Sequence, residues 1–301
     1  MSTVTPSTVS KSFDPCVQVG GKSGCQIELI ESEGITVLRK YASTAEYSPR
    51  LRRQAGKQRA FAQLSDAAEF RTPRVIDVRT HTDASRSYID MEYVHAEKYS
   101  TFLAHVSAVR LITFADGLIR YFDDAIHRSS SIDLNRGLLH DKLEAVTSQL
   151  PSCVAQEPIL MDTRRILGSP PTGQLLHGRC HGDFTLSNML FHADRVYLID
   201  FLDSFVETPL HDVVKLRQDT HFGWSLMLEP DLPSYQRHRV LQALRFIDGR
   251  VDRWLSNKPD IAEWCNYFQV FNLYRILPYL SKPAELSFVQ NALKQALKAC
   301  N

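Results

Sequence analysis

Apolar and polar side chains alternate with a period of two along residues 26–31, which predicts a half-buried β-strand. Four other short runs in the first third of the chain also look like strands, at residues 16–19, 35–40, 73–77 and 87–94. Glu33 and Gly34 form a hairpin-type break between two of these strands. Residues 51–64 instead carry their apolar side chains at helical spacing, so one helix is expected among the strands.

From residue 95 onwards the apolar positions recur near every 3.6 residues, which predicts helices. The longest predicted helix spans residues 102–127, and the others lie at residues 138–150, 213–218, 235–254, 261–279 and 285–299. Between them, residues 151–174 contain proline and glycine breaks, and residues 175–205 combine two strand-like runs with a loop.

A small sheet with one helix, followed by a larger helical part, predicts an α+β fold of two lobes. We expect a flexible tail at residues 1–15, which are rich in Ser, Thr and Pro, because such a segment buries little apolar surface. The N-terminal lobe is expected at residues 16–94 and the helical C-terminal lobe at residues 95–301.

The composition excludes several classes of function. The chain of 301 residues has 44% hydrophobic and 23% charged side chains and a formal net charge of +1, which argues against a dedicated nucleic-acid or membrane-surface binder. It has no apolar run of the ~18 to 20 residues that a membrane helix needs. Its six cysteines form no C-x-x-C pair, and no secretory signal is recognisable, so we expect reduced thiols and a cytoplasmic protein.

The strongest chemical pattern lies in the second lobe. His181, Asp183 and Asn188 form the arrangement H-x-D-x-x-x-x-N. In phosphoryl transfer, such an acid accepts the proton of the attacking hydroxyl group, and the amide oxygen five residues later holds a metal ion. Asp200 follows the apolar run 196–199, and a carboxylate at a strand end is suited to binding magnesium between phosphate oxygens. The pattern therefore predicts Asp183 as the catalytic base and Asn188 with Asp200 as metal ligands.

Residues 181–188, which read His-Gly-Asp-Phe-Thr-Leu-Ser-Asn, and the Leu-Ile-Asp-Phe sequence at 198–201 resemble one branch of the protein-kinase-like superfamily. This branch contains the aminoglycoside phosphotransferases and choline kinases, which have H-G-D where protein kinases have H-R-D. It also tends to lack a glycine after the Asp-Phe pair, and this chain has Leu202 there. A later aspartate that precedes a helix is typical too, and Asp212 fits that position.

The resemblance implies a bilobal protein-kinase-like fold that uses ATP and Mg²⁺. The implied reaction moves the γ-phosphoryl group to a hydroxyl of a small molecule, such as an amino sugar, a sugar or an amino alcohol. Asp212 is expected to brace the catalytic loop through backbone hydrogen bonds. Asp203 either assists a second metal or caps a turn. The acceptor is expected beside the helices after Asp212, with four candidate lining residues, Arg217, Asp219, Tyr274 and Arg275.

The same layout implies nucleotide-binding residues in the first lobe. Lys40 is expected to bind the α- and β-phosphates, with Arg39 as the alternative if the strand register slips by one residue. The segment that contacts adenine is expected at Met91, Glu92 and Val94.

A glycine-containing turn at residues 20–24 precedes the second predicted strand. It differs from a P-loop, because Cys16 stands where that motif requires glycine and because a strand follows instead of a helix. We expect Gly20, Gly21 and Gly24 to cover the phosphates through backbone N–H groups; the alternative is a plain hairpin turn.

The helix predicted at residues 51–64 departs from that of protein kinases, in which a glutamate pairs with the lysine. Residues 54–64 contain no acid and hold three glutamines, Gln54, Gln58 and Gln63. Either a glutamine orients Lys40, or its partner is Glu46 or Glu69. Two other functions stay open: a nucleotide-binding regulatory module without turnover, which the missing glutamate favours, and nucleotidyl transfer at the same metal site.

Overall fold

The computed structural model describes residues 25–32, 34–63, 69–79 and 87–300, and they form two compact units. The first unit holds residues up to 60 together with 73–94, and the second holds residues 61–72 and those from 95 onwards. Residues 61–72, placed in the N-terminal lobe by the sequence, belong to the second unit because Phe70 joins its sheet and packs against Phe114. The predicted tail, the strand at 16–19 and the glycine turn lie outside the described residues.

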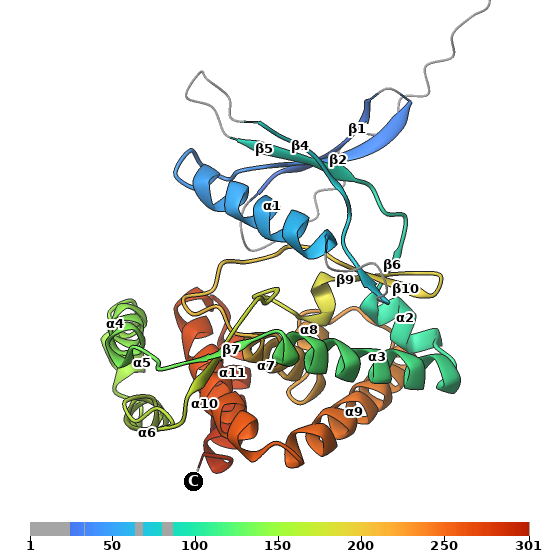
Figure 1. The fold of residues 1–301 in the computed structure, drawn as a ribbon. Helices are drawn as coiled ribbons and strands as arrows, with labels where there is room; N and C mark the ends of the chain where they lie inside the picture. The colour runs from blue at the N-terminus through green and yellow to red at the C-terminus, as the bar shows by residue number, and fades with distance from the viewer. Residues whose placement is uncertain (1–24, 33, 64–68, 80–86, 301) are drawn as a thin grey trace, which may run out of the picture. The chain divides into compact units, whose positions relative to one another are not determined.

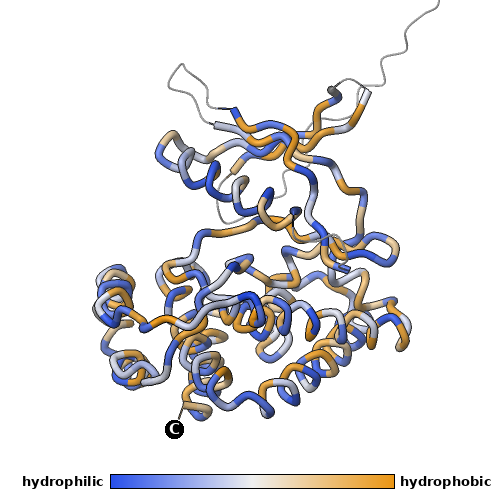
Figure 2. Tube along the Cα trace, in the orientation of Figure 1, coloured by the Kyte–Doolittle hydropathy of each residue, from blue (hydrophilic) through white to orange (hydrophobic). Residues whose placement is uncertain are grey.

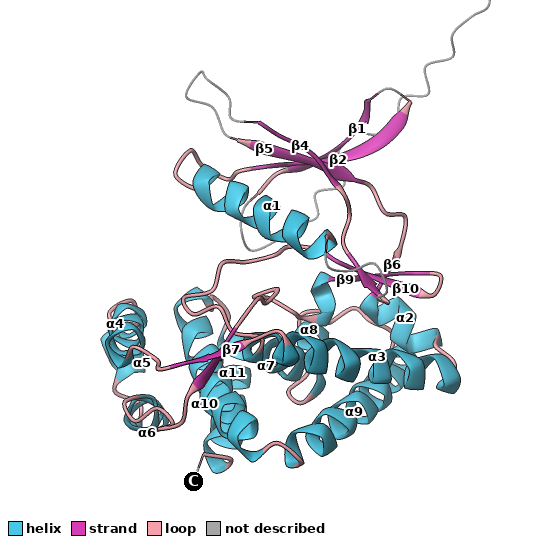
Figure 3. Cartoon of the chain, viewed as in Figure 1, coloured by secondary structure: helices cyan, strands magenta, loops and turns pink. Residues whose placement is uncertain are grey.

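The first unit contains a four-stranded antiparallel sheet with the strand order β1-β2-β5-β4 and one helix (Figures 1 and 3). Its elements are β1 (Ile27–Ser32), β2 (Ile35–Tyr41), α1 (Ser48–Ala62), β4 (Val75–Arg79) and β5 (Tyr88–Glu92). Gly34, with a φ of +76°, makes the turn between β1 and β2, a conformation that glycine adopts without steric cost. The core of this unit is formed by Ala42, Leu51, Ala55, Ile89 and Met91.

The second unit has helices around a small sheet with the strand order β3-β10-β9-β6. The strands of this sheet are β3 (Phe70–Arg71), β6 (Glu97–Lys98), β9 (Met189–His192) and β10 (Arg195–Leu198), and a separate pair is formed by β7 (Ser130–Ile132) and β8 (Leu175–His177). The helices are α2 (Tyr99–His105), α3 (Ala108–His127), α4 (Arg136–Thr147), α5 (Ser152–Ala155), α6 (Pro158–Leu167), η1 (Leu186–Asn188), α7 (Leu210–Thr220), α8 (Trp224–Met227), α9 (Ser234–Ser256), α10 (Pro259–Ile276), η2 (Leu277–Tyr279) and α11 (Pro283–Lys298).

The core of the second unit lies where α7 and α10 meet. Val213 and Leu216 on α7 and Phe268 and Phe271 on α10 are almost fully buried. Helices such as α3 and α9 alternate between hydrophobic and hydrophilic positions, as the sequence predicted (Figure 2). No helix among the described residues is both long and apolar enough to cross a membrane.

One prediction about the helices in this unit was wrong, and another segment holds more helix than its breaks indicated. The helix predicted at 102–127 is two helices, because Val106 and Ser107 are extended and the Ser107 hydroxyl caps α3 by accepting the Arg110 N–H. The segment 151–174 has the expected breaks but also holds two short helices, α5 and α6, and α6 begins at Pro158. Proline suits the first turn of a helix because its missing N–H has no partner there.

Candidate active site

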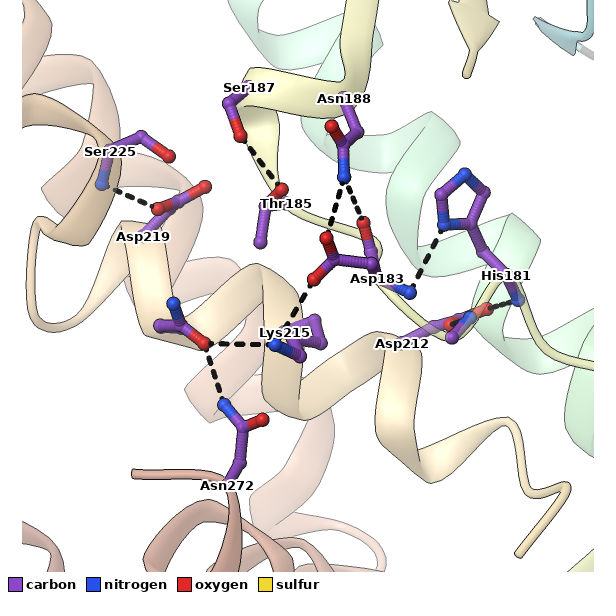
Figure 4. Close-up of polar contacts among 12 residues, drawn as sticks. His181, Asp183, Thr185, Ser187, Asn188, Asp212, Lys215, Asp219, Ser225 and Asn272 are labelled. Carbon is purple, nitrogen blue, oxygen red and sulfur yellow. Dashed lines mark hydrogen bonds and ion pairs between the residues drawn. The ribbon is translucent and has the colours of Figure 1, made fainter. Parts of the chain in front are cut away.

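The loop between β8 and β9 brings Asp183 and Asn188 side by side. The Thr185 N–H donates to the Asp183 carbonyl oxygen at 2.7 Å, and the Asn188 N–H donates to the Thr185 carbonyl oxygen at 3.0 Å, so the chain turns tightly. The Asn188 Nδ2 group then donates to the Asp183 Oδ2 and carbonyl oxygens, both at 2.9 Å. The Asn188 Oδ1 atom points away from Asp183 (Figure 4).

Asp212, in the first turn of α7, braces this loop as predicted. Its Oδ2 atom accepts the His181 N–H at 2.7 Å and the Tyr121 hydroxyl at 2.9 Å, and its Oδ1 atom accepts the Gly182 N–H at 2.9 Å. Asp212 has no exposed surface. Burial and the Asp212 charge raise the pKa of Tyr121 well above 10.0, so its hydroxyl stays protonated and donates.

His181 connects the loop to the segment that carries Asp200. Its Nδ1 atom accepts the Asp183 N–H at 3.2 Å, which assigns the proton to Nε2, and Nε2 donates to the Ile199 carbonyl oxygen at 2.8 Å. The His181 carbonyl oxygen accepts the Leu202 N–H at 2.9 Å. The histidine therefore holds the residues on both sides of Asp200.

Asp200 itself has a φ of +61° and an exposed side chain. The N–H of Ile199, the residue before Asp200, donates to the Asn188 carbonyl oxygen at 3.0 Å. This backbone hydrogen bond joins the chain segments that carry the two predicted metal ligands, Asn188 and Asp200. Left-handed backbone is uncommon for a residue with a side chain and is found where neighbouring contacts impose it.

Gly182 explains why the motif has glycine at its second position. Its φ is +86°, and a Cβ atom there would lie 2.3 Å from the Leu202 carbonyl oxygen and 3.0 Å from the Ser204 hydroxyl oxygen. No side chain fits between the loop and the 199–204 segment without moving the backbone.

Lys215 forms an ion pair with the predicted base. The Lys215 Nζ atom lies 3.1 Å from Asp183 Oδ1, and the side chains are 16% and 25% exposed (Figure 4). Burial by itself would raise the pKa of Asp183, but the Lys215 ammonium and the hydrogen bond from Asn188 hold it below 3.8. The Asp183 carboxylate is therefore ionised at neutral pH.

The sequence did not predict Lys215 as a site residue. The available signal was its position three residues after Asp212, which places both side chains on one face of α7. Asp219, four residues further on, also faces the loop: it accepts the Leu186 N–H at 2.6 Å and the Ser225 N–H at 2.9 Å. Burial raises the pKa of Asp219 to about 6.

The structure gives the candidate acceptor residues other contacts. Asp219 anchors the loop from a buried position, and the fully buried Tyr274 has its hydroxyl 3.0 Å from that of Thr147. Arg217 pairs with Asp248 and Asp252 on α9. The Arg275 guanidinium lies over the Phe205 ring.

Asn188 and Asp200 offer oxygen atoms suited to Mg²⁺. The Asn188 amide uses its N–H groups on Asp183, which directs Oδ1 outward, and the Asp200 carboxylate is exposed. Among the described residues, no cluster of three or more acidic, histidine or cysteine side chains could hold a metal. Two protein oxygens fit Mg²⁺ because that ion keeps several water or phosphate ligands.

In the first unit, the register of β2 places the Lys40 and Arg39 side chains on opposite faces of the sheet. Lys40 pairs with Ile89 and is 6% exposed, on the face that packs on α1. Arg39 points to the other face, where Asp90 binds it at 2.7 and 2.8 Å and it stacks on Tyr88.

The predicted adenine-contact segment ends the first unit. Met91 is buried on β5, and the exposed Glu92 donates its N–H to the Arg74 carbonyl oxygen at 2.9 Å. Val94 is the last residue of the unit. Gly20, Gly21 and Gly24 lie outside the described residues.

Helix α1 buries two of its glutamines. The Gln54 amide donates to the Tyr47 hydroxyl at 3.2 Å, and the Gln58 amide donates to the Pro73 carbonyl oxygen at 2.7 Å. Of the acids that flank this helix, Glu69 pairs with Arg120 at 2.5 Å.

A family model described as the phosphotransferase enzyme family (APH) matches residues 20–255. No curated protein matches the chain. A solved structure of a candidate aminoglycoside phosphotransferase from Ralstonia eutropha JMP134 has 13% sequence identity and a TM-score of 0.56 over 93% of this chain and 89% of its own.

Two other solved structures are similar to the chain. Plasmodium vivax ethanolamine kinase has 12% identity and a TM-score of 0.50 over 96% of this chain and 84% of its own. Spectinomycin phosphotransferase, in complex with ADP and spectinomycin, has 10% identity and a TM-score of 0.50 over 91% of this chain and 89% of its own. Such low identities show the fold alone. They confirm the predicted α+β, protein-kinase-like fold, and the family model confirms the resemblance.

Proposed function

Because the chain belongs to the phosphotransferase enzyme family, we propose that it transfers the γ-phosphoryl group of ATP to a hydroxyl group of a small molecule. The observation that carries this proposal is the ionised Asp183 carboxylate, one quarter exposed and fixed by Asn188 and Lys215. A fixed carboxylate of this kind orients an attacking hydroxyl group and accepts its proton.

In the proposed reaction, Asp183 accepts a hydrogen bond from the acceptor hydroxyl. The acceptor oxygen forms a bond to the γ-phosphorus, the bond between that phosphorus and the β–γ bridging oxygen breaks, and ADP leaves. The hydroxyl proton moves to Asp183. Asn188 and Asp200 would hold Mg²⁺, which when bound would neutralise charge on the phosphates. Positioning and charge neutralisation provide most of the rate enhancement in such reactions.

The remaining roles concern the nucleotide. Lys40 would bind the α- and β-phosphates, in keeping with its position on the α1 face of the sheet. Backbone groups of Glu92 and Val94, with Met91 beside them, would bind adenine, and N–H groups at Gly20, Gly21 and Gly24 would cover the phosphates. Support for a nucleotide and a small acceptor comes from the spectinomycin phosphotransferase structure, which holds ADP and spectinomycin.

The test is an ADP-release screen with the full chain, MgATP and a library of hydroxylated metabolites, followed by Asp183→Asn on every hit. Asparagine keeps the shape but removes the base, so we expect acceptor-dependent ADP release to fall by roughly 10²- to 10⁴-fold. Nucleotide affinity, measured by calorimetry, should stay within about threefold of the wild-type value, as expected if Asp183 acts on the acceptor. Full activity in Asp183→Asn would refute the assigned base.

Labelled ATP separates the alternative functions. Transfer of the γ-label to the acceptor supports the proposal. Transfer of the α-label would indicate nucleotidyl transfer, and nucleotide binding without any labelled product would indicate a regulatory module. The absence of an acid in residues 54–64 is the feature that favours the last of these.

A further inference from the structure

Three side chains on one face of α7 contact the catalytic loop. Asp212, Lys215 and Asp219 are spaced three and four residues apart, so they project from the same side of the helix. Asp212 and Asp219 accept backbone N–H groups of the loop, whereas Lys215 contacts the Asp183 side chain. The two acids fix the position of α7 against the loop, and Lys215 is thereby held at the base.

Lys215 has a donor left over for another group. An ammonium has three N–H donors. Among the described residues, Lys215 has two partners, the Asp183 carboxylate at 3.1 Å and the Gln218 Oε1 atom at 3.4 Å. The Gln218 Oε1 atom also accepts the Asn272 Nδ2 group at 2.6 Å, which fixes its position. Gln218 therefore helps to hold the Lys215 ammonium beside Asp183, and the third N–H of Lys215 is left for a substrate.

The acceptor hydroxyl, in the proposed reaction, is bonded to Asp183. Two successive hydrogen bonds of about 3 Å each place the acceptor oxygen within about 6 Å of the Lys215 Nζ atom. A carboxylate without a partner would attract an ammonium group near that hydroxyl. Lys215 cancels this attraction, because it places an equal and opposite charge at the same site.

We propose that Lys215 determines the acceptor class: the acceptor has no cationic group beside its reacting hydroxyl and is an uncharged polyol or a hydroxy acid. This inference rests on the proposed function. The third N–H of Lys215 donates to a hydroxyl or carboxylate oxygen of such a compound. Ethanolamine, the compound in the name of one structural relative, has an ammonium next to its hydroxyl and falls outside the class.

The experiment compares matched acceptors that differ in one group, namely glucose with glucosamine and ethylene glycol with ethanolamine, with glycolate as the hydroxy acid. Their kcat/KM values are measured for wild type, Lys215→Met and Lys215→Arg, and their Kd values by calorimetry in the presence of Mg²⁺ and a non-hydrolysable ATP analogue. Methionine has nearly the length of lysine without its charge, so packing is retained. Lys294→Met, on the exposed side of α11, controls for the change in net charge.

We expect wild type to favour the uncharged member of each pair, because Lys215 cancels the attraction of Asp183 for the amine and its third N–H donates to an oxygen atom of the uncharged acceptor. In Lys215→Met the ratio of amine to uncharged acceptor should rise by a factor on the order of 10 to 100, because at about 6 Å and an effective dielectric constant near 20 one charge has an effect of that size. Lys215→Arg and Lys294→Met should keep the wild-type ratio. The ratio is insensitive to a general loss of activity, which changes both members of a pair alike.

A wild-type preference for the amine, or an unchanged ratio in Lys215→Met, would overturn the inference. So would the absence of both transfer and binding for every uncharged and anionic compound. If no compound is phosphorylated but the Kd ratios change as expected, the inference about Lys215 stands and the proposed phosphoryl transfer fails. The two proposals can therefore fail separately.

Discussion

Replacing Gly182 by alanine tests how closely the catalytic loop packs on the segment that carries Asp200. The glycine has a φ of +86°, and an added Cβ would lie 2.3 Å from the Leu202 carbonyl oxygen. Ordinary contacts between carbon and oxygen are about 3.3 to 3.6 Å, so the carbonyl group has to move by about 1 Å. The Leu202 N–H, bonded to the His181 carbonyl oxygen at 2.9 Å, has to move with it.

The expected loss of stability has two parts. A side chain in left-handed backbone costs about 1 to 2 kcal/mol relative to glycine. Breaking the hydrogen bond between Leu202 and His181 adds about 1 kcal/mol. We therefore expect Gly182→Ala to lower the free energy of unfolding by about 2 to 3 kcal/mol. Because Asp200 moves relative to Asp183, acceptor-dependent ADP release should fall by about tenfold or more.

Gly223→Ala is the matched control. Gly223 has a φ of +79° but no atom within 4 Å of an added Cβ, so it has the backbone cost alone. Urea unfolding of both variants should show Gly182→Ala about 1 kcal/mol less stable than Gly223→Ala, and only the former should lose activity. Equal stabilities together with full activity of Gly182→Ala would show that the loop and the 199–204 segment are not tightly packed.

Two further predictions concern stability alone. Since burial raises the pKa of Asp219 to about 6 from 3.8, its ionisation is less favourable in the folded state; its contribution to stability should fall by about 3 kcal/mol as the pH rises from about 4 to about 6. The difference in urea unfolding free energy between wild type and Asp219→Asn should follow this change, and a constant difference across that range would contradict it. Gly249→Ala, at an exposed position inside α9 with open space around it, should raise the free energy of unfolding by about 0.5 to 1 kcal/mol, measured by urea unfolding, and a loss of stability would contradict the assigned helical environment.

The parts of the site that the sequence predicted are those built from neighbouring residues. Asp183 and Asn188 meet because a tight turn of the intervening chain leaves them few alternatives. Asp200 follows the apolar run 196–199, which looks like a strand, and the brace by Asp212 was implied by the resemblance. The strand that carries Lys40 was recognisable as a run of β-prone residues, but only the pairing of Lys40 with Ile89 fixes its register.

The parts that escaped prediction depend on contacts between distant residues. Lys215 meets Asp183 across 32 positions of the sequence (215 − 183), and a lysine in an amphipathic helix has the same local pattern whether it faces solvent or a carboxylate. Strand β3 has two residues and pairs with β10, far along the chain, so no periodicity marks it. The break at Ser107 depends on a single capping hydroxyl inside an otherwise continuous helical pattern.

His181 and Gly182 act on the reaction through geometry, whereas Asp183, Asn188 and Asp200 are the groups proposed to touch the reactants. The His181 ring binds the Ile199 carbonyl oxygen and the Asp183 N–H at once, so a movement of the segment that carries Asp200 is transmitted to Asp183, the proposed base. The Asp212 carboxylate accepts the backbone N–H groups of both His181 and Gly182, so the loop cannot shift to absorb such a movement. The base and the proposed metal ligands are thus parts of one hydrogen-bonded frame, and this frame explains why the first two letters of the H-G-D motif matter although neither is expected to contact ATP.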